Sequence, residues 1–137
     1  MIPVQLSQAA RYAIQALVFM GKERNGGVVA SSKIADAHGV PEPVLSKTLL
    51  TLAAEGLLQS VKGSSGGYRL ARPLAEISLL DIVEAVNGPV RCQASFFSDG
   101  TTGTLDRNLE VIAERAAEAI RRQFQRIRLS HLAGEAA

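Results

Sequence analysis

Apolar residues first recur at helical spacing in residues 7–23. The pattern begins directly after Ser7, a residue type that often provides the N-cap of a helix. Residues 24–27, Arg-Asn-Gly-Gly, interrupt it, and residues 28–30 resemble a short extended piece. We therefore predict a helix over 7–23 whose apolar positions are Ala10, Ala13, Ile14, Leu17 and Val18.

Two further helices are predicted close together. One is short, with Ser31 or Ser32 as its N-cap and Gly39 as its stop, and with Ile34, Ala35 and Ala37 facing inward. The other begins at about Glu42 and ends at Gly56, and its apolar stripe consists of Leu45, Leu49 and Leu52. Two helices joined by a tight turn are typical of a helix-turn-helix.

A β-hairpin is predicted next. Apolar and polar positions alternate around Leu58 and Val61, and again around Tyr68 and Leu70, on either side of a Gly-rich turn. A helix-turn-helix followed directly by a hairpin is a winged helix. The predicted fold class is mainly α with one small hairpin, and residues 1–75 form the winged helix-turn-helix domain.

Residues 76–137 are predicted to form a second region. A compact helix within 77–89 has Ser78 and Asp81 at the spacing of a capping pair and ends at Gly88 and Pro89. Residues 90–104 show no periodicity and form a loop of about fifteen residues, long enough to suggest a function. Thr104 then caps a long helix, and Ser130 caps a short terminal turn.

The long helix carries an apolar stripe that steps by threes and fours. At about 35 Å it exceeds what a small winged-helix body covers, so we expect a second copy of the chain to pack on it. The alternative is that it folds back on its own domain. The predicted dimerisation stripe is Leu105, Leu109, Ile112, Ala116, Ile120, Phe124 and Ile127.

Charge is unevenly distributed, although the 137-residue chain has a net charge of only +2. Residues 1–75 hold eight Lys and Arg against four acidic residues, whereas residues 76–137 hold seven against nine. The basic half suits a polyanion partner. A single cysteine allows no internal disulfide, which suggests a cytoplasmic, reducing compartment. The start has no signal-peptide pattern, and no apolar run has membrane-spanning length.

The Gly-rich stretch within residues 60–73 is the clearest candidate for phosphate contact. A nucleotide-binding loop would place Gly-Lys-Ser/Thr at the start of a helix, but here the lysine precedes the glycines and a strand follows. A plain hairpin turn is one interpretation. As a wing, the stretch would have a tip slim enough to enter or ride a minor groove, with DNA contacts from Lys62, Ser64, Ser65, Gly66 and Arg69.

Three segments, LSQAARYAIQAL (6–17), KIADAHGV through GGYRLARP (33–73) and ISLLDIVEAVNGP (77–89), closely resemble the Rrf-type (IscR/NsrR/CymR-like) bacterial winged-helix regulators. The resemblance covers nearly the whole chain. It implies a homodimeric transcription factor, commonly a repressor, whose long helix crosses to its partner. It also implies double-stranded DNA with a pseudo-palindromic operator as the ligand.

The same resemblance makes the helix from Glu42 the recognition helix. Lys47 would then donate to guanine or phosphate, Ser46 to either, and Val44 would contact a thymine methyl group. Phosphate contacts are expected from Arg11, Ser32 and Lys33 near helix ends. The residues that face away from the apolar stripe are Pro43, Val44, Ser46, Lys47 and Thr51.

The chain departs from its cluster-holding relatives in the loop before the long helix. Those relatives carry three cysteines there, whereas this chain has only Cys92, with Ser98 and Thr104 near the other positions. Hydroxyl groups are poor iron ligands, so a three-cysteine iron–sulfur site is excluded. Three interpretations of Cys92 stay open: a cluster ligand beside non-cysteine ligands, a thiol switch whose thiolate Arg91 favours, or an inert residue.

Other classes of function are less well supported. The sequence shows no clustered acid/base pair, no metal-ligand spacing and no nucleophile beside a base, so we do not expect an enzyme. A winged helix also serves as a protein-interaction adaptor, and control by a partner protein or a small effector with Cys92 inert stays open. Lys33, Lys47 and Lys62 favour DNA over an adaptor role.

Overall fold

The computed structural model describes residues 6–22, 27–91 and 103–134. Helix α1 (Gln8–Gly21) begins at the predicted N-cap, because the Ser7 hydroxyl accepts a hydrogen bond from the Ala10 amide. The same hydroxyl donates to Asn87 at 2.9 Å, which ties the start of α1 to the end of helix α4 (Leu79–Asn87). Of the predicted apolar positions of α1, Ala10, Ala13 and Leu17 are buried, whereas Ile14 and Val18 are half-buried.

Helices α2 (Ser31–His38) and α3 (Glu42–Ala54) form the predicted helix-turn-helix. Gly39 ends α2 in the left-handed conformation, at a φ of 64°. The predicted N-cap was wrong: Ala30 holds that position, Ser31 and Ser32 lie in the first turn, and no side chain caps the helix. Ala37 is exposed, also contrary to prediction.

The predicted hairpin consists of β1 (Leu58–Val61) and β2 (Gly67–Leu70), paired antiparallel. A third segment joins it, because Val29 exchanges two backbone hydrogen bonds with Tyr68, of 2.8 and 2.9 Å. Gly67 permits this pairing. Its φ is 153°, and a Cβ atom there would collide with the backbone of Val29.

The short helix α4 begins with the predicted capping box. The Ser78 hydroxyl accepts from the Asp81 amide, and the Asp81 carboxylate accepts from the Ser78 amide, each at 3.0 Å. A 3-10 helix, η2 (Leu74–Glu76), which we did not predict, connects the hairpin to α4. Ser78 is buried, so its hydroxyl needs this partner.

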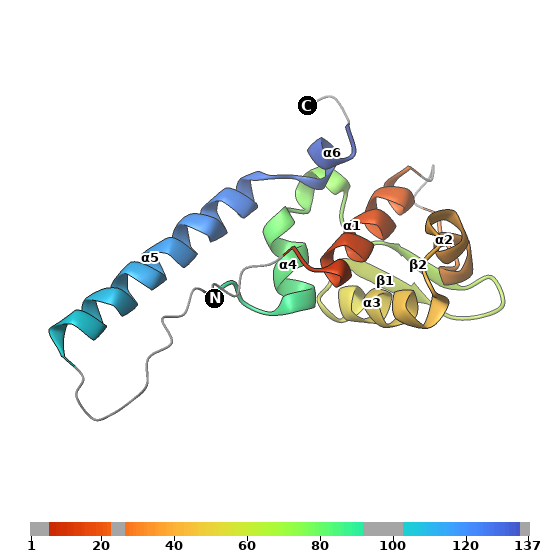
Figure 1. The fold of residues 1–137 in the computed structure, drawn as a ribbon. Helices are drawn as coiled ribbons and strands as arrows, with labels where there is room; N and C mark the ends of the chain where they lie inside the picture. Colours follow the sequence, from red (N-terminus) through yellow and green to blue (C-terminus); the bar gives the residue numbers. More distant parts are fainter. Residues whose placement is uncertain (1–5, 23–26, 92–102, 135–137) are drawn as a thin grey trace.

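Helix α5 (Thr104–Arg126) projects from the body, with its later turns against α4 and its first turns away from the rest of the chain (Figure 1). The short helix α6 (Leu129–Leu132) follows it. The predicted caps Thr104 and Ser130 were wrong: Gly103 and Arg128 hold the N-cap positions, and no side chain caps either helix.

The apolar stripe on α5 divides into two parts. Ile120, Phe124 and Ile127 are half-buried against Leu79, Val83 and Val90, and Ile127 follows the helix as its C-cap. Three residues of the first part are exposed, Leu105 at 70%, Ile112 at 59% and Ala116, whereas Leu109 is half-buried.

One core connects the winged helix with the segment beyond residue 75. The main cluster of buried residues includes Leu17, Leu49 and Leu52 from the winged helix together with Ile77, Ile82 and Leu129. Helices α4 and α6 therefore stabilise the winged helix directly. The assignment of DNA binding to residues 1–75 and of sensing and dimerisation to 76–137 stays a functional prediction.

Candidate nucleic-acid interface and sensor segment

Helix α3 separates a buried face from an exposed one. Leu45, Leu49 and Leu52 are at most 1% exposed and hold the helix on the core, as the stripe predicted. Lys47 and Pro43 are exposed on the other face, and Val44 is 45% exposed. The buried stripe therefore determines which side chains of α3 can meet a ligand.

Two hydroxyl groups of α3 are engaged within the helix. Thr51 Oγ1 donates to the Lys47 carbonyl at 3.0 Å, and Thr48 Oγ1 donates to the Val44 carbonyl at 3.1 Å. Ser46 and Thr51 are only half-buried, so both still reach the surface. The main charged donor on the exposed face is the ammonium group of Lys47.

Sequence reasoning missed Leu50, which is 61% exposed. It follows the buried Leu49 directly, and in a helix rich in leucine its exposure was not recognised from composition. Helical spacing places Leu50 three residues after Lys47, on the same side of the helix. That spacing was the signal that would have identified it.

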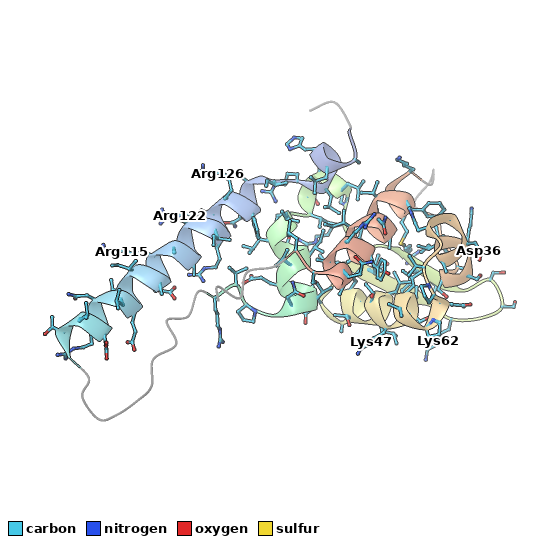
Figure 2. The ribbon with its side chains drawn as sticks, viewed as in Figure 1. Asp36, Lys47, Lys62, Arg115, Arg122 and Arg126 are labelled. Atoms are coloured by element: carbon cyan, nitrogen blue, oxygen red, sulfur yellow. The ribbon has the colours of Figure 1, made fainter. Side chains whose placement is uncertain are left out.

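The turn of the hairpin projects from the body as a wing (Figure 1). Lys62, Ser64 and Ser65 are exposed, and Gly66 is half-buried. Figure 2 shows Lys47 and Lys62 on the same side of the molecule, although fifteen positions of sequence separate them. The fold therefore brings the exposed face of α3 and the wing onto one surface, which we call the basic face.

The glycines of the wing have an internal role as well. Gly66 donates its amide to the Gly63 carbonyl at 3.0 Å, and a Cβ atom on it would collide with the carbonyl of Val61. Arg69 stands opposite Gln59 in the register and donates to it at 2.8 Å. The Arg69 side chain is exposed, so this hydrogen bond orients a cation that solvent and ligands can reach.

The remaining predicted phosphate contacts lie on α1 and α2. Arg11 is exposed near the start of α1, and Ser32 and Lys33 are exposed in the first turn of α2. Their role in DNA contact stays a prediction.

The segment before Cys92 is held by two charged side chains. The Glu84 carboxylate accepts from the Val90 amide at 3.1 Å, and Arg121 Nη1 donates to the Val90 carbonyl at 2.8 Å. Val90 is 5% exposed, and the Arg121 side chain is 25% exposed. We call this arrangement the Val90 clamp; it connects α4 and α5, and no local sequence signal predicts it.

Acidic neighbours orient the arginine of the clamp. Arg121 Nη2 lies 2.6 Å from Glu114 and 2.9 Å from Glu118. Its hydrogen bond lowers the pKa of Glu118, and the two carboxylates raise the pKa of Arg121. Arg115, Arg122 and Arg126 lie along the side of α5 that faces away from Lys47 and Lys62 (Figure 2). These arginines therefore do not extend the basic face.

Cys92 lies outside the described residues. Within the described part of the chain, no group of three His, Cys, Asp or Glu side chains is placed to hold a metal ion. The whole chain contains one cysteine. Since thiolates are the usual ligands of iron–sulfur clusters, this donor set does not fit a three-cysteine cluster.

Comparison with known proteins identifies relatives along most of the chain. A family model described as "Rrf2: Iron-dependent Transcriptional regulator" matches residues 6–135. The HTH-type transcriptional regulator IscR of Cereibacter sphaeroides is 31% identical over 110 residues, which is 77% of this chain and 71% of that protein. Other curated relatives, named as HTH-type regulators, are 37% identical over 87 residues; the chain spans about half of their length, 54%.

Solved structures share the fold. CymR, the global cysteine regulator of B. subtilis, has a TM-score of 0.74 at 23% identity, covering 98% of this chain and 99% of that one. The oxidized form of Staphylococcus aureus CymR has a TM-score of 0.71 at 25% identity, covering 98% and 99%. None of the helices among the described residues combines the length and the apolar character needed to cross a membrane.

Proposed function

Because the chain belongs to the Rrf2 family of transcriptional regulators, we propose that it is a homodimeric repressor that binds a pseudo-palindromic operator. The basic face supports this proposal: α3 and the wing present Lys47 and Lys62 on one side (Figure 2). In this proposal α3 enters the major groove, while the wing follows the phosphate backbone. The protein acts where the chromosome lies, in the bacterial cytoplasm.

The proposed phosphate contacts lie along the basic face. Lys62, Ser64, Ser65 and Arg69 are placed on the hairpin, and the amide of Gly66 closes its turn. Several lysines and arginines would neutralise phosphates of a duplex that spans α3 and the wing, and the counterions bound to those phosphates would be released. Binding therefore weakens steeply as salt rises. Arg11, Ser32 and Lys33 add further contacts in this proposal.

Dimerisation would cover the exposed part of the α5 stripe. Leu105, Ile112 and Ala116 face solvent in the single chain, over about 17 Å of helix. An apolar stripe on a projecting helix is covered most simply by the same stripe of a second copy, related by a two-fold axis. Two copies would present two basic faces, which matches a pseudo-palindromic site.

The experiment is a fluorescence anisotropy titration of the full chain against genomic DNA fragments at several salt concentrations. We expect saturable, sequence-preferring binding whose affinity falls as salt rises. In a transcription reaction, the fragments that bind best should then give less transcript when the protein is added. An absence of sequence-preferring binding would refute DNA recognition and leave a protein-interaction adaptor as the explanation of the winged helix.

We place the signal at the segment that contains Cys92. The Val90 clamp supports this, because a change two residues away would act on α4 and α5 together. S. aureus CymR, which shares the fold, has been solved in an oxidized form, and this favours the thiol switch over an inert cysteine. Two alternatives to the thiol switch stay open. One is a cluster that uses Cys92 with non-cysteine ligands, and the other is control by a partner protein or a small effector.

An absorbance spectrum of anaerobically purified protein, with iron and sulfide assays, distinguishes these three alternatives. A coloured protein that contains iron and sulfide supports a cluster with non-cysteine ligands. A colourless protein whose DNA affinity changes with oxidant, and no longer changes in Cys92→Ser, supports the thiol switch. A colourless protein that is insensitive to oxidant supports a partner or effector.

A further inference from the structure

Leu50 is a large apolar side chain that α3 leaves in solvent. It is 61% exposed, and Val44 is 45% exposed. The other leucines of α3 lie on the core side and are buried. A single exposed leucine needs no explanation. Here, however, two large apolar side chains lie on the one helical face that also carries Lys47.

Helical spacing places Lys47 between them. Leu50 is three residues after Lys47 and Val44 is three residues before it, so all three share one face. The six-residue separation of Val44 and Leu50 corresponds to about 9 Å along the helix axis. Along a DNA groove this is about two or three base pairs, at roughly 3.4 Å per step.

The remaining chemistry of this face offers few hydrogen-bond donors. The Thr51 hydroxyl donates to the Lys47 carbonyl, Thr48 is buried, and Pro43 has neither a side-chain donor nor an amide hydrogen. The half-buried Ser46 hydroxyl lies next to Lys47 in sequence, but not at the helical positions three residues before and after it. Lys47 is therefore flanked by hydrocarbon. On either side of Lys47, a face of this composition distinguishes bases by apolar contact, and the thymine methyl is the apolar group that a base exposes in the major groove.

The charges nearby favour DNA over another protein as the occupant. Lys47 and Lys62 lie on the same side (Figure 2), and a second copy packed through this face about a two-fold axis would bring like charges together. We infer that Leu50 and Val44 contact thymine methyl groups on either side of the base pair that Lys47 contacts. This inference rests on the proposed DNA-binding function and makes Leu50 a specificity-determining residue.

The test separates methyl contact from DNA binding itself. High-affinity duplexes are selected from a random library with the full chain, and each thymine in the half-site is then replaced by deoxyuridine, which lacks only the methyl group. We expect selected half-sites to carry thymines two or three base pairs apart. Replacing the thymine that contacts Leu50 should weaken binding about fourfold, the effect of one buried methyl group.

Leu50→Ala should bind the thymine and deoxyuridine duplexes equally at that position and keep the penalty at the position that contacts Val44. Leu132→Ala, which removes an exposed leucine from α6, is the matched control and should keep both penalties. Sequence-preferring binding that is insensitive to deoxyuridine would overturn this inference and leave the proposed function intact. A chain that selects no sequence would overturn both.

Discussion

Arg121 on α5 donates a 2.8 Å hydrogen bond to the carbonyl of Val90, a residue 31 positions earlier in the chain. The Val90 amide is held at the same time by the Glu84 carboxylate of α4. Both backbone groups of a buried residue are thus satisfied by charged side chains from two helices. Val90, two residues before Cys92, is therefore held on both sides by hydrogen bonds.

Removing the arginine of the Val90 clamp should destabilise the fold. Arg121→Ala leaves the Val90 carbonyl without its partner, so we expect the free energy of unfolding to fall by about 1–3 kcal/mol. Urea denaturation followed by circular dichroism measures this. Arg122→Ala is the control, since its side chain is 71% exposed and pairs with Glu118 on the surface; we expect a change within about 0.5 kcal/mol. Equal effects of the two variants would contradict the clamp.

Gly67→Ala should separate Val29 from the hairpin. A Cβ atom at position 67 would collide with the backbone of Val29, and an L-residue would be strained at a φ of 153°. We expect a loss of about 1–3 kcal/mol of stability and faster hydrogen exchange at the Val29 and Tyr68 amides. Gly103→Ala, at the N-cap of α5 with open space around it, should cost about 0.5–1 kcal/mol through the poorer cap and leave hydrogen exchange at the Val29 and Tyr68 amides unchanged. Unchanged exchange at Val29 in Gly67→Ala would argue against this role.

Lys47 and Lys62 should contribute differently to DNA binding. Lys47→Ala, on α3, should relax sequence preference at one position of the half-site by about 1–3 kcal/mol. Lys62→Ala, on the wing, should weaken all sequences alike and reduce the salt slope by about one ion. Competition titrations with selected and scrambled duplexes distinguish these outcomes. Identical profiles for the two variants would show that Lys47 does not read a base.

Charge placed on the exposed part of the α5 stripe should prevent dimerisation. Leu105→Glu combined with Ile112→Glu puts two carboxylates into the proposed interface, and we expect a monomer by sedimentation at concentrations where the parent chain is a dimer. Val111→Glu is a matched control, because Val111 is 49% exposed but lies off the stripe. A dimer that persists in the double variant would place the interface elsewhere.

Local signals predicted most of the elements. The N-caps Ser7 and Ser78, the stop at Gly39 and the stripe of Leu45, Leu49 and Leu52 depend on residues within one or two turns of each other, and each was confirmed. The N-cap errors had a local cause too. Serine or threonine lay within two positions of the true caps, but Ala30, Gly103 and Arg128 have the extended backbone that the cap position needs.

The sequence by itself determined that α3 has one apolar face and that α5 carries a longer stripe, because periodicity depends only on helix geometry. Only the tertiary structure decided what covers each stripe. Ile120 and Phe124 lie against α4, whereas Leu105 and Ile112 stay exposed, and Leu50 proved to be outside the core. The Val90 clamp likewise required the fold, since a contact across 31 residues leaves no local pattern. Periodicity tells which side of a helix is apolar, but packing in space determines which partner buries it.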